Sequence, residues 1–341
     1  MANNERNISL DFIRALSLIL VIATHTFPKP LADNLLFTSF FNMFLYTCNS
    51  NFYMLSGQLN LKKKFETPQD YKIYYLKKVS SIAIPYIIAT CILTLWTAIA
   101  DGEKITFASY FEAVYADIMW ENITIHLWYM YPLIGMLISA PFLSKMLHNM
   151  KNEELHILFG VAIAWNIVSI FFTKNIGVGF TYLGWLLSDW ILFFFLGYYS
   201  SRVITSENKK KWYFAGFICL LINVLGMYLM PANYNNPTDL AVPFVIWATA
   251  VFAFWQQELV INNKIVKAVI QFLAKHSFMA YMIHWNVCLL VTPKIVTDTR
   301  VIVYFLESLV LTFTISLLLA VVIDVCLINP IQKVFKKKFL Q

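Results

Sequence analysis

Long apolar windows alternate with short polar breaks along the whole chain. Each window is close to the roughly 20 helical residues that cross a hydrocarbon core of about 30 Å. In lipid every backbone polar group must find its hydrogen bond inside the protein, which favours helices, and the pattern lacks the alternating strands of a membrane barrel. It therefore predicts an all-α polytopic membrane bundle of about ten transmembrane helices, near residues 8–27, 38–60, 79–100, 124–147, 154–173, 181–201, 213–230, 239–257, 269–291 and 301–327.

The composition agrees with this pattern. Apolar residues make up 59% of the 341 residues and charged residues only 13%, and the mean hydropathy is +0.64, whereas soluble domains are near a quarter charged. The first window is too long, and too poor in a small-residue cleavage site, to be a removable signal peptide. We expect a single transmembrane domain over residues 1–341, in a multi-pass protein of the cell's cytoplasmic membrane.

The basic residues predict the orientation. With the N-terminus placed inside the cell, 20 of the 26 Lys and Arg residues fall in segments on the inner side. Cytoplasmic loops carry such an excess, so we expect an even number of crossings and both termini in the cytoplasm. The formal net charge of +7 then belongs mostly to the inner face, where it suits anionic lipid. Nothing in the pattern supports nucleic-acid binding.

The cysteines and glycines point to no bound metal or nucleotide loop. The five cysteines each fall in a different predicted crossing, at no metal-ligand spacing, so we interpret them as packing residues and predict no metal site. A glycine-rich phosphate motif is also missing, which disfavours a nucleotide-hydrolysing pump.

The first window, LDFIRALSLILVIATH, carries Asp11, Arg14 and His25 in an otherwise apolar run. Arg14 and His25 are eleven residues apart, so in a helix they share one face and lie about 16 Å apart along the axis, with Asp11 one turn before Arg14. Each ionisable group costs at least ~2.5 kcal/mol near the bilayer centre, so we expect this stripe to face the bundle interior. The alternative is an Asp11–Arg14 pair at the inner interface and a histidine in the outer headgroups.

These residues resemble the acyltransferase 3 family of multi-helix membrane acyltransferases, whose first helix carries an arginine, ten residues and a histidine. The resemblance continues in NFYMLSGQL (51–59), HLWYMYPLIGMLISAPFL (126–143) and KHSFMAYMIHW (275–285). One departure lies before the third crossing, where the family often has two basic residues three positions apart. This chain keeps Lys77 and Lys78 but has Ser81 where the second basic residue would stand.

The resemblance implies an O-acyltransferase, with an acetyl group as the expected acyl group. The donor would be cytoplasmic acetyl-CoA, used as a substrate with no cofactor bound permanently. The acceptor would be a hydroxyl of an envelope polysaccharide or lipid-linked sugar. The catalytic residues would be His25, Arg14 and Asp11, with His25 as the general base, Arg14 as a donor fork that offsets developing negative charge, and Asp11 as the group that holds Arg14.

The remaining candidates each have a plain structural alternative. Arg14, Lys77, Lys78 and Ser56 would bind the donor, although the lysines also suit anionic lipid and Ser56 also suits close helix packing. His126, Trp128 and His284 would border the acceptor site. The alternatives there are an interfacial aromatic belt and a purely structural hydrogen bond for His284.

Two other functional classes remain open. A transporter or flippase of a lipid-linked sugar would also need many crossings and polar groups in its interior, although no internal repeat is evident. A scaffold within an envelope-synthesis complex would tolerate replacement of Arg14 and His25. Consumption of a thioester distinguishes the enzyme from both.

Overall fold

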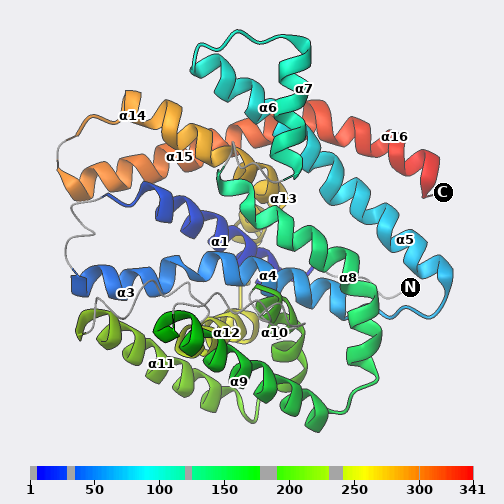
Figure 1. Ribbon diagram of the computed structural model, residues 1–341, viewed down its shortest axis with the longest axis vertical. Coiled ribbons are helices and arrows are strands. Elements are labelled where there is room, and N and C mark those ends of the chain that lie inside the picture. The colour runs from blue at the N-terminus through cyan, green and yellow to red at the C-terminus, as the bar shows by residue number, and fades with distance from the viewer. Residues whose placement is uncertain are drawn as a thin grey trace. The chain divides into compact units, whose positions relative to one another are not determined.

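The computed structural model describes residues 6–28, 35–119, 125–176, 190–229, 241–298 and 300–340, and the regular structure within these ranges is helical throughout. The chain forms two compact units, whose helices are labelled in Figure 1. Unit 1 comprises residues 1–24, 29–64 and 139–271, and unit 2 comprises residues 25–28, 65–138 and 272–341.

Most helices of unit 1 run along the predicted crossings. Its elements are α1 (Ile8–Thr26, as far as residue 24), α3 (Leu35–Leu45), α4 (Thr47–Leu61), the end of α8 (Met130–His148), α9 (Asn152–Ile176), α10 (Trp190–Val203), α11 (Lys209–Leu229), α12 (Val242–Glu258) and the start of α13 (Lys264–Asn286, as far as residue 271).

The core of unit 1 is the pair of helices α4 and α10, which approach each other at two reciprocal glycines. A Cβ atom added to Gly57 would lie 1.7 Å from the carbonyl oxygen of Phe194, and one added to Gly197 would lie 1.8 Å from the carbonyl oxygen of Met54. Small residues allow helix backbones to come this close in membrane proteins. Gly57, which directly follows Ser56, therefore has a packing role in this helix pair.

Unit 2 differs from unit 1 in its interrupted helices. Its elements are α5 (Pro68–Lys78), η1 (Val79–Ala83), α6 (Ile84–Ala100), α7 (Phe107–Met119), η2 (Ile125–Tyr129), the start of α8, α13 (Lys264–Asn286, from residue 272), η4 (Val287–Val291), α14 (Thr292–Ile295), α15 (Val301–Ile323), η5 (Asp324–Ile328) and α16 (Asn329–Phe339). The segments η1, η4 and η5 are single π-helical turns, and π turns occur frequently at functional sites.

Local sequence explains where α5 begins. Thr67 precedes Pro68 at the first helical position, and the carboxylate of Asp70 accepts a hydrogen bond of 2.8 Å from the backbone N–H of Thr67. In return the Thr67 hydroxyl accepts one from the backbone N–H of Asp70. This capping box satisfies N–H groups that the first turn of a helix leaves free.

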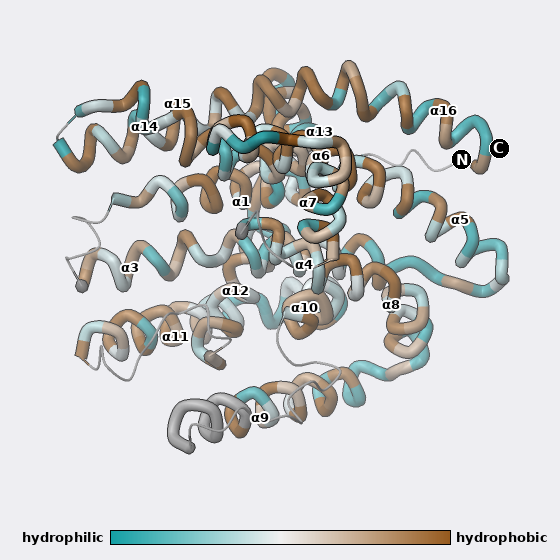
Figure 2. The backbone as a smooth tube through the Cα atoms, turned by 45° about the horizontal axis from the view of Figure 1, so that its top comes forward, coloured by the Kyte–Doolittle hydropathy of each residue, from teal (hydrophilic) through white to brown (hydrophobic). Residues whose placement is uncertain are grey.

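Helices fill the predicted windows as far as these are described, three windows include a π turn at one end, and the short helices α5, α7, α14 and α16 lie outside the windows. The window at 38–60 is broken at Tyr46 into α3 and α4, and of the window at 181–201 only the part from residue 190 lies within the described residues. Figure 2 shows hydrophobic residues, in brown, along most of the helical paths. The all-helical fold is thus confirmed.

Five helices are long and apolar enough to cross a membrane among the parts of the chain that the structure describes. They are Ile8–Thr26, Pro68–Ala100, His126–His148, Lys209–Leu229 and Val301–Phe339. The total of about ten crossings, the cytoplasmic location of the termini and the single domain stay predictions.

The glycine contacts generate a stability prediction. We expect Gly57→Ala and Gly197→Ala each to lower the free energy of unfolding by about 1–3 kcal/mol, because the new methyl group must push one helix backbone away from the other. Gly160→Ala in α9 is the matched control, since a Cβ there meets nothing within 4 Å and alanine favours the helix. Thermal unfolding in detergent compares the three variants. Equal melting temperatures for all of them would contradict the close approach.

Candidate functional site

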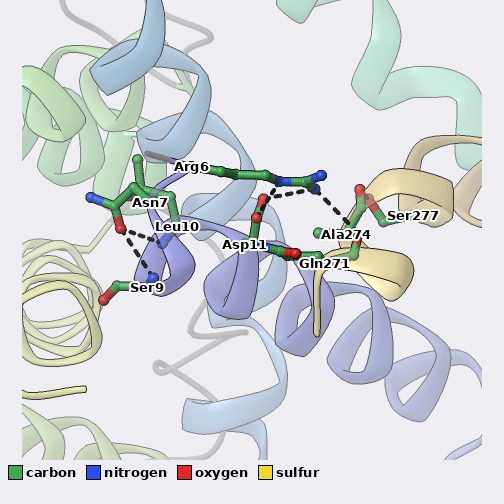
Figure 3. A network of polar contacts seen from close by, with 8 residues as sticks. All are labelled: Arg6, Asn7, Ser9, Leu10, Asp11, Gln271, Ala274 and Ser277. Carbon is green, nitrogen blue, oxygen red and sulfur yellow. Dashed lines mark hydrogen bonds and ion pairs between the residues drawn. The ribbon is translucent and has the colours of Figure 1, made fainter. Parts of the chain in front are cut away.

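The N-terminal end of α1 is held by an ion pair that the sequence pattern did not indicate (Figure 3). The Arg6 guanidinium donates from Nη2 to Oδ1 of Asp11 at 3.1 Å and to the backbone oxygen of Gln271 at 3.2 Å, and its Nε also contacts Oδ2 of Asp11. Asp11 is buried, with 6% of its surface exposed. Charge-assisted bidentate contacts of this kind are among the strong hydrogen bonds of proteins.

The partner of Asp11 that the structure shows is Arg6, whereas the expected pairing of Asp11 with Arg14 stays a prediction. Both oxygens of the Asp11 carboxylate are engaged by Arg6, which precedes the helix and folds back over its first turn. The helical spacing of three residues placed Asp11 and Arg14 on one stripe but did not reveal this competing partner. Arg14 lies in α1 as predicted and is half-buried.

Three histidines from distant parts of the sequence meet within unit 2. They are His25 at the end of α1, His126 in η2 and His284 near the end of α13. The ring centroids of His25 and His284 lie 5.3 Å apart, and those of His126 and His284 lie 5.2 Å apart. His284 therefore lies between the other two in a row of contacting imidazoles, which we call the histidine cluster.

The two buried members are fixed by backbone carbonyl groups. His126 is 2% exposed and His284 is fully buried. Nε2 of His126 donates to the carbonyl oxygen of Met282 at 2.7 Å, and Nδ1 of His284 donates to that of Tyr281. The Tyr281 hydroxyl in turn donates to the backbone oxygen of His126 at 2.7 Å.

These bonds determine the tautomers of the two rings. A carbonyl oxygen only accepts, so the ring nitrogen that faces it carries the proton. The other nitrogen of each ring, Nδ1 of His126 and Nε2 of His284, is then an acceptor in the neutral imidazole, and it has no hydrogen-bond partner within the described ranges. Buried acceptors without partners are rare in native proteins and call for an explanation.

His25 is the exposed member of the cluster. Its ring lies edge-on to Trp285, with centroids 4.8 Å apart, and its backbone oxygen accepts a contact of 3.5 Å from Sγ of Cys288. An accessible imidazole beside two buried and immobilised ones has the arrangement expected of a proton acceptor held against a binding surface.

Trp285 and Tyr281 are parts of this arrangement that were not predicted from the sequence. Trp285 contacts His25 and also stacks on His126, with centroids 6.1 Å apart and planes at 29°. Both residues lie in the segment KHSFMAYMIHW. Trp285 directly follows His284, and this position next to a candidate histidine is the sequence signal that could have indicated it as a site residue. Trp128, the aromatic residue that was predicted, is half-buried and lies edge-on to Tyr129.

The predicted donor-binding residues lie in different units. Lys77 and Lys78 end α5 in unit 2; Lys77 is exposed, and the ammonium of Lys78 lies 5.4 Å from the centre of the Tyr74 ring. Ser56 lies half-buried on α4 in unit 1, where its backbone oxygen accepts from the Asn60 amide at 2.6 Å.

A second histidine of α13 has a carboxylate partner. Nδ1 of His276 lies 2.6 Å from Oδ2 of Asp324 in η5, and the two side chains are 3% and 15% exposed. This pair ties α13 to the π turn within unit 2. Because 48 residues separate the two groups along the chain, sequence spacing gave no signal for it.

Comparison with known proteins identifies a family. The sequence model of a family described as an acyltransferase domain matches residues 7–321. No curated protein and no solved structure matches the chain. The matched range includes all three members of the histidine cluster.

The hydrogen bonds of the cluster predict different stability effects for its members. We expect His126→Ala to lower the free energy of unfolding by about 1–3 kcal/mol, because it removes the hydrogen bond to the Met282 carbonyl oxygen and leaves a cavity where a buried ring was packed. His25→Ala removes an exposed ring, and we expect a change within about 0.5 kcal/mol. Thermal unfolding of the purified variants measures both. A His25→Ala variant as unstable as His126→Ala would show that His25 has a structural role.

Proposed function

The chain belongs to the acyltransferase 3 family, and from this premise we propose that it is a membrane-bound O-acyltransferase, specifically an O-acetyltransferase of the cell's cytoplasmic membrane. It would move an acetyl group from acetyl-CoA to a hydroxyl of an envelope polysaccharide or a lipid-linked sugar. The observation that carries the proposal is the histidine cluster, in which an exposed imidazole lies against two buried imidazoles whose free nitrogens only accept hydrogen bonds.

His25 acts as the general base in this proposal. The acceptor hydroxyl is a weak nucleophile at neutral pH, and a positioned base contributes roughly 10²- to 10⁴-fold in rate. The imidazole removes the hydroxyl proton as the oxygen attacks the thioester carbonyl. The thiolate of the coenzyme leaves, and the proton taken by His25 ends on that sulfur. Transfer is therefore balanced without any further reactant.

His284 and His126 serve the acceptor. Their unpartnered nitrogens suit the hydroxyl groups of a sugar, which donate hydrogen bonds, and the cost of burying these nitrogens is relieved once such a donor binds. The aromatic faces of Trp285 and Trp128 offer flat apolar surfaces for a sugar ring. This assignment keeps His126, Trp128 and His284 as acceptor-binding residues and adds Trp285.

Arg14, Lys77, Lys78 and Ser56 serve the donor. The coenzyme carries several phosphate charges, which suit the ammonium groups at the end of α5, and Arg14 offsets the negative charge that develops on the thioester oxygen. Asp11 supports this indirectly, because its ion pair with Arg6 fixes the first turn of the helix that carries Arg14. A continuous polar passage from the donor side to His25 is a further expectation of this proposal.

Removal of the base tests the central assignment. We expect His25→Ala to abolish acetylation of the envelope glycan, a mass difference of about 42 Da per acetyl group, while protein level and topology stay intact. Without the imidazole the reaction loses the roughly 10²- to 10⁴-fold contribution of general base catalysis. Mass spectrometry of surface polysaccharide from cells that express each form measures the product. Normal acetylation by the variant would exclude His25 as the base.

The transporter alternative is tested with purified protein. An acyltransferase given acetyl-CoA and an acceptor glycan releases free coenzyme, whereas a flippase or a scaffold consumes no thioester. The family provides no support for a transporter. Coenzyme release that depends on both the acceptor and His25 is the expected result.

The charge at Arg14 is tested by a conservative change. We expect Arg14→Lys to lower kcat/KM for the donor by at least about tenfold, because lysine keeps the charge but loses the planar pair of donors that a thioester oxygen or a phosphate accepts from. Lys77→Arg is the matched control, since it keeps the charge at a site that needs only electrostatic attraction. Full activity of Arg14→Lys would show that charge alone is sufficient.

A further inference from the structure

The last helix, α16 (Asn329–Phe339), has none of its residues buried within the protein. Ile331, Val334 and Phe339 are 43%, 69% and 47% exposed, although all three are apolar. The helix has 11 residues and continues directly from η5. Its apolar side chains therefore face away from the described part of the protein and are free to contact lipid.

The side chains of α16 are sorted onto two faces. At about 100° per residue, Ile331, Val334 and Phe335 recur at the i, i+3, i+4 spacing of one face. Lys333, Lys336 and Lys337, all exposed, project from the opposite face, and the segment 329–339 contains no acidic residue. In Figure 2 hydrophilic and hydrophobic stretches alternate along α16. The remaining lysine, Lys338, lies over the ring of Phe339 at 5.3 Å.

The preceding helix places α16 at the membrane surface. α15 has 23 residues, which corresponds to about 34 Å and already exceeds a hydrocarbon core of about 30 Å. α16 continues from it through the single π turn η5. It therefore begins at the depth of the lipid headgroups.

We propose that α16 is a surface anchor that binds the anionic phospholipids of the membrane. Its apolar face enters the boundary between headgroups and acyl chains, and its lysines reach the phosphate groups. Apolar residues on one face and lysines on the other are the features of helices that lie in a membrane interface, and lysines beside a membrane span attract anionic lipid.

The exposed apolar side chains of α16 favour a lipid surface over a soluble coenzyme as the partner of its lysines. The phosphates of a soluble coenzyme would account for the lysines alone. They would leave Ile331 and Val334 in water, whereas a lipid surface accommodates both faces of the helix. The anchor does not depend on the proposed acyl transfer.

The anchor is connected to the start of another span of unit 2. Nε2 of Gln332 donates to the backbone oxygen of Ser80 in η1 at 2.7 Å. Ser80 precedes α6, so a lipid-bound α16 also holds the inner end of that helix.

Hydrogen exchange tests the anchor in the full-length protein. The chain is placed in nanodiscs of phosphatidylcholine alone and in nanodiscs that also contain phosphatidylglycerol, and amide exchange of residues 329–339 is followed by mass spectrometry. We expect exchange to slow in the anionic discs by about fivefold for each lysine that reaches the headgroups. The slowing should be lost in Lys333/Lys336/Lys337→Gln and, without any substitution, at high salt.

The control removes equal charge elsewhere. Lys62/Lys63/Lys64→Gln neutralises three exposed lysines between α4 and α5, and we expect it to leave exchange in α16 unchanged. Ile331→Asn is a second variant, which removes an apolar contact and should raise exchange even in anionic discs.

Two outcomes would overturn the proposal. One is equal exchange of wild-type α16 in both kinds of disc and at all salt concentrations. The other is slowing that requires coenzyme A in phosphatidylcholine discs, because α16 would then belong to the donor site. Neither outcome bears on His25. Failure of the anchor proposal can therefore be distinguished from failure of the acyltransferase proposal.

Discussion

A polar group that leaves water for hydrocarbon must find its partner in the protein, and this requirement governs both compact units. The simplest solution is local. Ser17 donates to the carbonyl oxygen of Ile13 at 2.7 Å, and Thr90 donates to that of Tyr86 at 3.0 Å, each one turn earlier in its own helix. Groups that a helix cannot satisfy alone are satisfied by other elements, as Asp11 is by Arg6 and His276 is by Asp324. Among the buried polar atoms of the described residues that have no hydrogen-bond partner, Nδ1 of His126 and Nε2 of His284 lie together in the histidine cluster, which is where function is best sought.

The fold could be predicted from the sequence to the level of its elements, because the length of an apolar window is set by the thickness of a bilayer. The interruptions could not. Tyr46 separates α3 from α4 inside one continuous apolar window, and nothing in its hydropathy marks the break. The sequence also does not indicate where the π turns lie, because a helix accommodates one extra residue without any change in composition.

The candidate site could be predicted as residues but not as an arrangement. A histidine in an apolar window stands out because burial is costly, so His25, His126 and His284 were each identified. Their contact depends on packing between segments more than 100 residues apart, which helical spacing does not encode. The same limit applies at Asp11. Spacing within a helix favoured Arg14, whereas the observed partner, Arg6, lies before the helix begins.

The π turns η1 and η5 carry a consequence for how this chain tolerates insertions and deletions. Each joins an apolar span to a short lysine-bearing helix, α5 or α16, and each contains one residue more than an α-helical turn would need. Loss of a single residue there would close the wide turn into a regular α-helical turn, and because the π turn already holds the extra residue, the side chains before and after it would keep nearly the same relative direction. A one-residue deletion in η1 or η5 would thus leave the lysines of α5 and α16 on the side of the helix that they occupy now, whereas the same deletion inside α6 or α15 would turn them by about 100° relative to the far end of that span.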